Sequence, residues 1–171
     1  MKLIIGIGNP GGEYVNTRHN AGLLVVDQIN QIQNSKLKSQ NYNSKLKNFV
    51  AKKSDVFMNE SGSFVKGALS KYPSIPVSNL YIVHDDLDIP LGIYKIQFGV
   101  GPKVHNGVKS IDEALGTDEY WHVRVGVDNR GNPTSREATR GEEYVLQDFC
   151  EGERKILDHV IKEVCKKLAT F

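Results

Sequence analysis

The first eleven residues combine a short apolar run with a glycine-rich turn. The run at 3–7 contains only leucine, isoleucine and one glycine, which is typical of a buried strand. The turn at 6–11 reads Gly-Ile-Gly-Asn-Pro-Gly and matches G-x-G-x-x-G. Glycines let the backbone turn tightly beside a strand end, where ligands tend to bind in α/β sheets. This stretch therefore favours an α/β fold with a binding site beside the turn.

A dinucleotide-binding loop is the first hypothesis that this motif raises. Such a loop needs a helix that starts within the glycines and an acidic residue about 20 positions further on that reaches the ribose. Residues 12–20 offer almost no apolar face for a helix, and Asp27 lies in a predicted helix rather than at a strand end. A nucleotide-cofactor enzyme is therefore the weakest of the functional hypotheses.

The rest of the chain alternates strand-like and helix-like patterns, which predicts a layered α/β fold. Two polar stretches, at 34–48 and 128–141, read as a link and a loop, and neither divides the chain, so we expect a single domain over 1–171. The alternation at 121–127 predicts a half-buried strand. The expected strands are 2–8, 46–51, 79–84, 93–98 and 121–127, and the expected helices are 21–32, 61–72, 108–115 and 154–168.

Charge and cysteine content narrow the class of protein. The net charge of +2 does not by itself indicate a nucleic-acid partner, so any RNA affinity must come from clustered charge. Cys150 and Cys165 form no C-x-x-C pair and have no zinc-like partner set, which favours a reduced, cytoplasmic protein. The first apolar run is too short for a signal peptide, and no stretch approaches the length of a membrane span.

Unusual polar residues gather in four places, at 9–11, 58–62, 84–88 and 105–107. Loops that follow the strands of an α/β sheet converge on one edge, so these clusters are expected to meet. Neither a G-x-S-x-G elbow nor a cysteine at a helix start is present, which argues against covalent acyl transfer. A histidine can instead act as general base on water, a carboxylate can orient it, and asparagine amides can stabilise an oxyanion.

A magnesium site is the competing interpretation of the third cluster. His84, Asp85, Asp86 and Asp88 are rich in oxygen ligands and would suit a metal-dependent phosphohydrolase. Neighbours in an extended segment point to opposite faces, however, so not all of them can face one ion. A simple turn-and-cap cluster ahead of Pro90 is the third interpretation.

These residues, taken together and in order, resemble the bacterial-type peptidyl-tRNA hydrolase family. The resemblance covers most of the chain, and its most specific parts are Thr-Arg-His-Asn-Ala-Gly and Met-Asn-x-Ser-Gly. The matching segments are 6–11, 13–14, 17–22, 57–62, 84–90, 105–107, 121–127 and 143–146.

The resemblance implies a single α/β domain with a mixed sheet flanked by helices, which frees tRNA from peptidyl-tRNA by ester hydrolysis without a metal or other cofactor. His19 resembles the general base and Asp85 its orienting carboxylate. The resemblance further implies that the amides of Asn9 and Asn59 hold the peptide and position the water, and that Asn20, His105 and Asn106 contact the substrate. Tyr14 and Met58 are implied to line the cleft. Lys95 and Arg124 are implied to form a basic site for the terminal phosphate of the tRNA acceptor end. We expect a cytoplasmic monomer with no membrane partner.

The sequence departs from the family pattern at several positions. The stretch 101–104 reads Gly-Pro-Lys-Val, where the family has a flexible Gly- and Ser-rich loop, and Pro102 and Val104 stiffen it. Gln97 replaces a second basic residue of the phosphate site, and Lys103 is a candidate substitute. The stretch 52–57 lacks the usual Pro-x-Thr, and the loop 128–141 is unusually rich in arginine. An RNA-binding protein that does not hydrolyse its ligand is therefore the main alternative, although the retained His19 and Asp85 argue against it.

Overall fold

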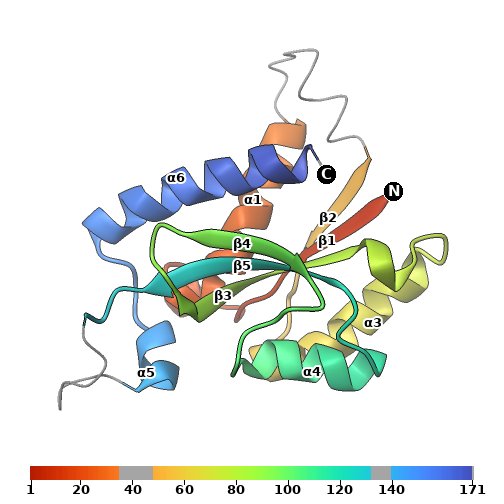
Figure 1. The fold of residues 1–171 in the computed structure, drawn as a ribbon, viewed down its shortest axis with the longest axis horizontal. Helices are drawn as coiled ribbons and strands as arrows, with labels where there is room; N and C mark the ends of the chain where they lie inside the picture. The colour runs from red at the N-terminus through yellow and green to blue at the C-terminus, as the bar shows by residue number, and fades with distance from the viewer. Residues whose placement is uncertain (35–47, 132–139, 171) are drawn as a thin grey trace.

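A computed structural model describes residues 1–34, 48–131 and 140–170 of the protein. Figure 1 shows a twisted sheet at the centre, with helices packed above and below it. The strands are β1 (Lys2–Gly6), β2 (Phe49–Lys53), β3 (Leu80–Pro90), β4 (Tyr94–Phe98) and β5 (Trp121–Asp128). The helices are α1 (Ala21–Asn34), α3 (Ser61–Lys71), α4 (Asn106–Leu115), α5 (Gly141–Val145) and α6 (Glu151–Leu168).

The five strands form one mixed sheet in the order β2-β1-β3-β5-β4. The β1–β2, β1–β3 and β3–β5 pairs are parallel, and only the edge strand β4 runs antiparallel, against β5. The central strand β3 has a core on each face, with Val83 in the core beneath α1 and α6 and Ile82 in the core beneath α3 and α4, which explains its nearly continuous burial. This arrangement confirms the expected α/β fold with a mixed sheet.

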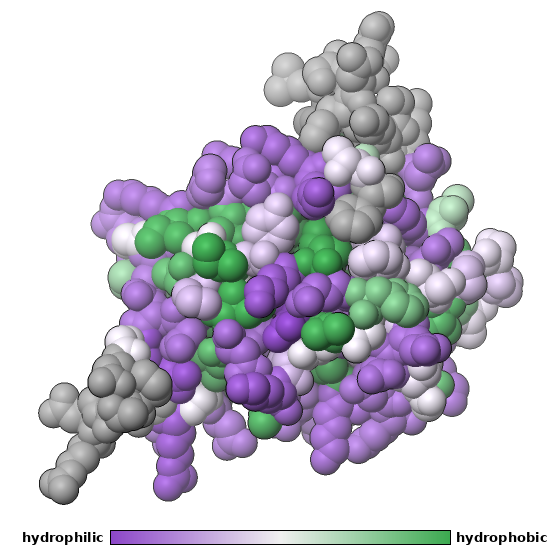
Figure 2. All heavy atoms as spheres, in the orientation of Figure 1, coloured by the Kyte–Doolittle hydropathy of each residue, from purple (hydrophilic) through white to green (hydrophobic). Residues whose placement is uncertain are grey.

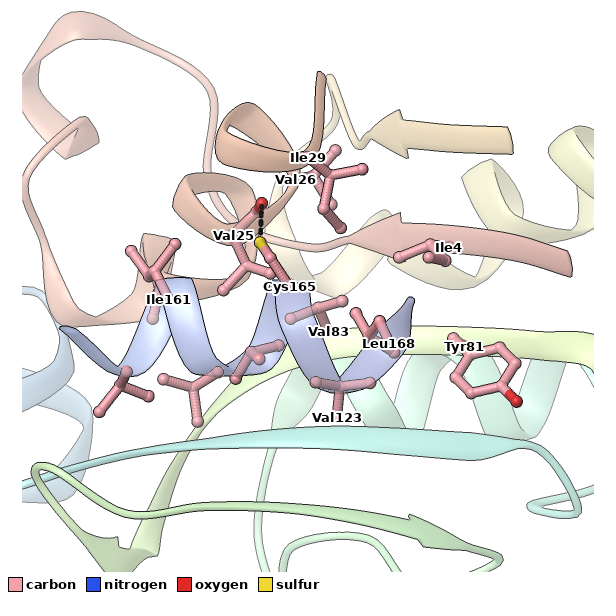
Figure 3. Close-up of a cluster of buried hydrophobic side chains, with 14 of the residues drawn as sticks. Ile4, Val25, Val26, Ile29, Tyr81, Val83, Val123, Ile161, Cys165 and Leu168 are labelled. Carbon is pink, nitrogen blue, oxygen red and sulfur yellow. Dashed lines mark hydrogen bonds between the residues drawn. The ribbon is translucent and has the colours of Figure 1, made fainter. Parts of the chain in front are cut away.

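Helices cover the sheet in two layers, each with its own core. Helices α1 and α6 pack on one face, where Ile4, Val25 and Leu157 are fully buried (Figure 1). The other core contains Ile5 and Ile111 and lies beneath α3 and α4. Figure 3 shows Cys165 pointing from α6 toward α1, with Sγ 4.0 Å from the Val25 carbonyl oxygen. Burial raises the pKa of the Cys165 thiol to about 12, so this cysteine behaves as an apolar core residue.

Strand β3 carries an irregularity where polar residues begin. Its register with β5 runs regularly to the Asp86–Gly126 pair and resumes only at the Pro90–Asp128 pair. Three residues of β3, 87–89, lie opposite a single residue of β5 between these pairs, so this segment bulges out of the ladder. Bulges often occur beside functional sites, because they redirect side chains away from the regular pleat.

The structure corrects several sequence predictions. Strand β3 extends to Pro90 instead of ending at residue 84, so the cluster 84–88 is part of a strand and not a turn or cap. The predicted half-buried strand at 121–127 is buried on both faces, because its valines pack in the core beneath α1 and α6, while His122 packs against Tyr120 and Arg124 pairs with Asp86 on the other face. Strand β2 lies two to three residues later than expected, and α5 was not predicted. Most of the predicted link 34–48 and loop 128–141 lies outside the described residues.

Hydrophobic residues on the surface form separate patches. Figure 2 shows green patches over the region of β4 and α6, with hydrophilic residues between them. Ile93 and Phe98 near the two ends of β4 and Ile156 on α6 are the exposed hydrophobic residues of this region. No helix in the described ranges has the length and apolar content needed to cross a bilayer.

Candidate active site

His19 lies on the short 3-10 helix η2 (Arg18–Asn20), directly before α1. Gly22 in the first turn of α1 lies so close to β3 that a Cβ there would collide with the Val83 carbonyl oxygen. This contact holds the start of α1 against the central strand, two residues before Asp85. Arg18 secures the other side, because its guanidinium donates to the Gln147 carbonyl oxygen at 3.0 Å and to the buried Glu153 carboxylate at 2.6 Å.

The His19 ring is hydrogen-bonded to a buried carboxylate. His19 Nδ1 lies 2.8 Å from Asp85 Oδ1, so the Nδ1–H donates and Nε2 carries the free lone pair. Burial lowers the pKa of His19, but the charge and hydrogen bond of Asp85 outweigh it and raise the pKa above the ordinary value. Burial acts to raise the pKa of Asp85, yet the two neighbouring histidines hold it well below its usual range. Asp85 is therefore an ionised carboxylate that favours the imidazolium form of His19.

His105 is the second histidine bound to Asp85. Its Nε2 lies 2.9 Å from the same Oδ1 atom. Its Nδ1 accepts the backbone N–H groups of Gly107 and Val108 at 3.2 and 3.3 Å and so caps helix α4. These contacts assign the proton to Nε2, which donates to Asp85. His105 thus supports the carboxylate, and its side chain is only 4 % exposed.

Asn9 presents its amide group toward the same region. Its backbone N–H donates to Asn20 Oδ1 at 2.8 Å, and Asn20 Nδ2 donates back to the Asn9 carbonyl oxygen at 3.0 Å. Asn9 Oδ1 accepts the Met58 backbone N–H at 2.9 Å. Since the oxygen is occupied, the NH₂ group of Asn9 is the part left for a ligand. Asn20 is buried, and its side-chain amide is hydrogen-bonded on both atoms to the backbone of Asn9.

Asn59 comes to the site on the 3-10 helix η3 (Met58–Glu60), which follows β2. The Ser110 hydroxyl of α4 donates to the Asn59 carbonyl oxygen at 2.8 Å, so the backbone of this turn is tied to the helix that His105 caps. Asn59 and Asn106 both have exposed side chains. Amides from two elements thus flank the histidine and carboxylate pair.

These residues line one open cleft with a volume of about 760 Å³. The structure brings together seven of the residues predicted from the sequence, and it adds an apolar rim that includes the exposed Phe57, Val104 and Leu146. The predicted residues in the lining are Asn9, His19, Met58, Asn59, Asp85, His105 and Asn106.

Four predicted residues lie outside the described lining of the cleft. Tyr14 packs edge-on against Phe57, with ring centroids 6.4 Å apart, and Asn20 supports Asn9 from behind. Arg124 is buried, with Nε donating to Asp86 Oδ2 at 2.7 Å and Nη1 donating to Gln97 Oε1 at 3.0 Å. Lys95 is exposed and lies opposite Arg124 in the β4–β5 ladder.

The predicted magnesium ligands do not gather around one point. Asp85 is bound by two histidines, Asp86 pairs with Arg124, and Asp88 Oδ2 accepts the Lys103 backbone N–H at 3.0 Å. Within the described residues, one group has ligand atoms close enough for a metal, namely His19, Asp85 and His105, within 4.8 Å of one another. His19 Nδ1 and His105 Nε2 donate to Asp85, so an ion bound through these two nitrogen atoms would have to displace both hydrogen bonds.

Two further histidines lie behind Asp85. His84 Nδ1 donates to the Asp85 carbonyl oxygen at 2.8 Å, and its Nε2 lies 3.4 Å from His122 Nδ1. Burial lowers the pKa of His84 well below its ordinary value and that of His122 to about 4. Both rings are therefore neutral near pH 7 and fill the protein interior behind Asp85. His122 was not among the residues singled out in the sequence.

A mixed α/β sheet that places a histidine–carboxylate pair beside free amides in an open cleft defines an enzyme of the hydrolase class. The sequence comparison makes this assignment specific, because the model of the peptidyl-tRNA hydrolase family matches residues 3–171. The chain belongs to the peptidyl-tRNA hydrolase family.

Individual relatives agree with the family match. The peptidyl-tRNA hydrolase of Aliarcobacter butzleri is 38 % identical over 167 residues, which cover 95 % of this chain and 87 % of the relative. That of Frankia casuarinae is 39 % identical and covers 95 % and 85 %. The crystal structure of peptidyl-tRNA hydrolase from Acinetobacter baumannii superposes with a TM-score of 0.80 at 31 % identity, covering 98 % of this chain and 86 % of that chain.

Proposed function

We propose that this protein hydrolyses the ester between the carboxyl group of a peptide, or of an N-blocked amino acid, and the terminal ribose of tRNA. The observation that carries the proposal is the His19–Asp85 pair, which opens into a cleft beside the Asn9 amide. His19 Nε2 takes a proton from water as the water attacks the ester carbonyl, and Asp85 stabilises the imidazolium that forms. The C–O bond to the ribose then breaks, and the ribose oxygen takes the proton back from His19 Nε2, which leaves a free peptide carboxyl and a tRNA hydroxyl. Asn9 and Asn59 hold the peptide and the water in position.

We propose further that this reaction needs no metal and that a single-domain monomer performs it in the cytoplasm. The hydrogen bonds from His19 and His105 to Asp85 support a metal-free site, since they already engage the carboxylate and one ring nitrogen of each histidine. On the face that Figure 2 shows, hydrophilic residues separate the hydrophobic patches, which supports a monomer as far as that face is concerned.

The direct test is release of peptide from N-acetyl-aminoacyl-tRNA by the purified protein, with and without a chelator. We expect multiple turnovers at the same rate in both conditions. Loss of turnover in chelator would indicate a metal-dependent hydrolase. Tight tRNA binding by folded protein that releases no peptide would instead support the RNA-binding alternative.

We propose that Lys95 binds the terminal 5′-phosphate of the tRNA acceptor end, with Arg124 behind it. Residues opposite each other in an antiparallel pair project from the same face, so the two cations lie side by side on the sheet. Asp86 and Gln97 orient the Arg124 guanidinium. Arg124 is unsuitable for a test by truncation, because its loss would leave Asp86 as a buried unpaired charge.

Lys95→Ala is therefore the informative variant for the terminal phosphate. We expect the KM for 5′-phosphorylated peptidyl-tRNA to rise about fivefold, as for one exposed charge pair, with no change for the dephosphorylated substrate. Lys66→Ala removes an exposed lysine from α3 and serves as the control, with no expected change for either substrate. Equal effects of Lys95→Ala on both substrates would rule out the terminal phosphate as its ligand.

A further inference from the structure

A lysine at the cleft has no assigned part in the reaction described above. Lys103 is exposed and lies in the short loop between β4 and α4. Among the described residues that line the cleft, it is the only lysine or arginine. Its ammonium group makes no ion pair with another described residue, whereas the guanidinium of Arg124 is paired with Asp86. The Lys103 charge is therefore available to a bound ligand.

The loop holds Lys103 in a defined place next to β3, the strand that carries Asp85. Its backbone N–H donates to Asp88 Oδ2 at 3.0 Å, and the Asp88 backbone N–H donates to Asp86 Oδ1 at 2.8 Å. Two residues further along, His105 is fixed to Asp85 and to the start of α4. The backbone on both sides of the Lys103 side chain is thus connected to the segment of β3 that carries Asp85.

Lys103 is distinctive because the other charged side chains that line the cleft are acidic. Four carboxylates line the cleft, those of Asp85, Asp86, Asp88 and Glu142. Such a lining repels phosphate groups, except where a cation offsets it. A polyanionic ligand that reaches His19 is therefore best accommodated with a phosphate beside Lys103.

The chemistry of the substrate supplies such a phosphate. The scissile ester lies on a hydroxyl of the last ribose, and that ribose carries, a few covalent bonds away, the phosphodiester that joins it to the preceding nucleotide. When the ester carbonyl is at His19, this phosphodiester must lie in or near the same cleft. We propose that Lys103 binds the last phosphodiester of the tRNA 3′ end and so aligns the ester with His19. The proposal rests on the proposed function and assigns a different phosphate from the one assigned to Lys95.

Binding of a non-hydrolysable ligand tests this proposal. The ligand is an RNA minihelix with a peptide attached to its 3′ end through an amide, made with either a normal last phosphodiester or an uncharged methylphosphonate at that linkage. We expect Lys103→Ala to weaken binding of the normal ligand about fivefold and to lower the slope of log Kd against log salt by about 0.7. Both differences should disappear with the methylphosphonate, and Lys103→Arg should bind like the wild type.

Lys109→Ala is the matched control, since it removes an exposed lysine from α4 that is not among the described lining residues. It should leave the affinity for both ligands unchanged. The proposal is wrong if Lys103→Ala weakens binding of both ligands equally, which would indicate a peptide contact, or weakens neither. Hydrolysis of N-acetyl-aminoacyl-tRNA by the wild type is measured separately, so absence of turnover would contradict the proposed function without deciding the binding result.

Discussion

The His19→Ala variant is expected to lose at least about 10³-fold in kcat while it remains folded and still binds peptidyl-tRNA. The change removes the group that accepts the proton of the attacking water, and no other described residue offers a free imidazole nitrogen in the cleft. Asp85 keeps its hydrogen bond from His105, so the carboxylate is not left without a partner. The rate of peptide release under substrate saturation measures the loss, and filter binding measures the affinity for tRNA.

His159→Ala provides the control, because His159 is an exposed histidine on α6. It should retain full activity. Thermal unfolding of both variants then shows whether the fold is intact. Normal turnover by a folded His19→Ala protein would contradict the mechanism, even though the family assignment would stand.

Asp85→Asn is expected to reduce kcat by about 10²–10⁴-fold, because the amide keeps an acceptor oxygen but loses the charge that stabilises the imidazolium. The pH dependence should change as well. The raised pKa of His19 depends on the Asp85 charge, and burial alone would lower it. In the wild type, activity should therefore fall as the pH drops through a midpoint above about 6.5, the ordinary histidine value. In the variant, that midpoint should move to lower pH.

Profiles of kcat/KM against pH for the two proteins measure this shift. Asp158→Asn, which removes an exposed carboxylate on α6, should leave the profile unchanged. An acid limb at the same pH in Asp85→Asn and the wild type would mean that His19 is not the titrating base, or that Asp85 does not set its pKa.

The sequence was sufficient for the fold class and for most elements, because buried parallel strands and amphipathic helices have clear hydrophobic patterns. It was less informative where polar residues occur inside the sheet. Asp85 and Asp86 interrupt the apolar pattern of β3, so the strand was expected to end before them. Each carboxylate has a charged or hydrogen-bonding partner from a distant element, and no local pattern can reveal such partners. Helix α6 starts at Glu151, earlier than expected, because the Glu153 carboxylate accepts the Cys150 N–H and so caps the start of the helix.

The functional site, like the fold, was predicted from the sequence only in part. Asn9, His19, Asn59 and Asp85 were singled out from motifs, and the structure places all four at one cleft. The motif around His105 suggested a contact with substrate, and the structure adds that its ring binds Asp85 and caps α4, contacts that depend on tertiary geometry and leave no local sequence pattern. Arg124 illustrates this too, because its guanidinium is enclosed between Asp86 and Gln97.

Strand β3 lies at the centre of the sheet, between β1 and β5, and it carries Asp85. A carboxylate on an edge strand or a surface loop could be lost by local fraying while the remainder of the protein stayed intact. Asp85 pairs with Val125 of β5, two residues beyond the last β1–β3 pair at Val83, so it leaves its place when the central β3–β5 ladder opens, which amounts to global unfolding. Peptide release in increasing denaturant should therefore report cooperative unfolding of the whole sheet, so that catalytic activity serves as a folding probe for this chain.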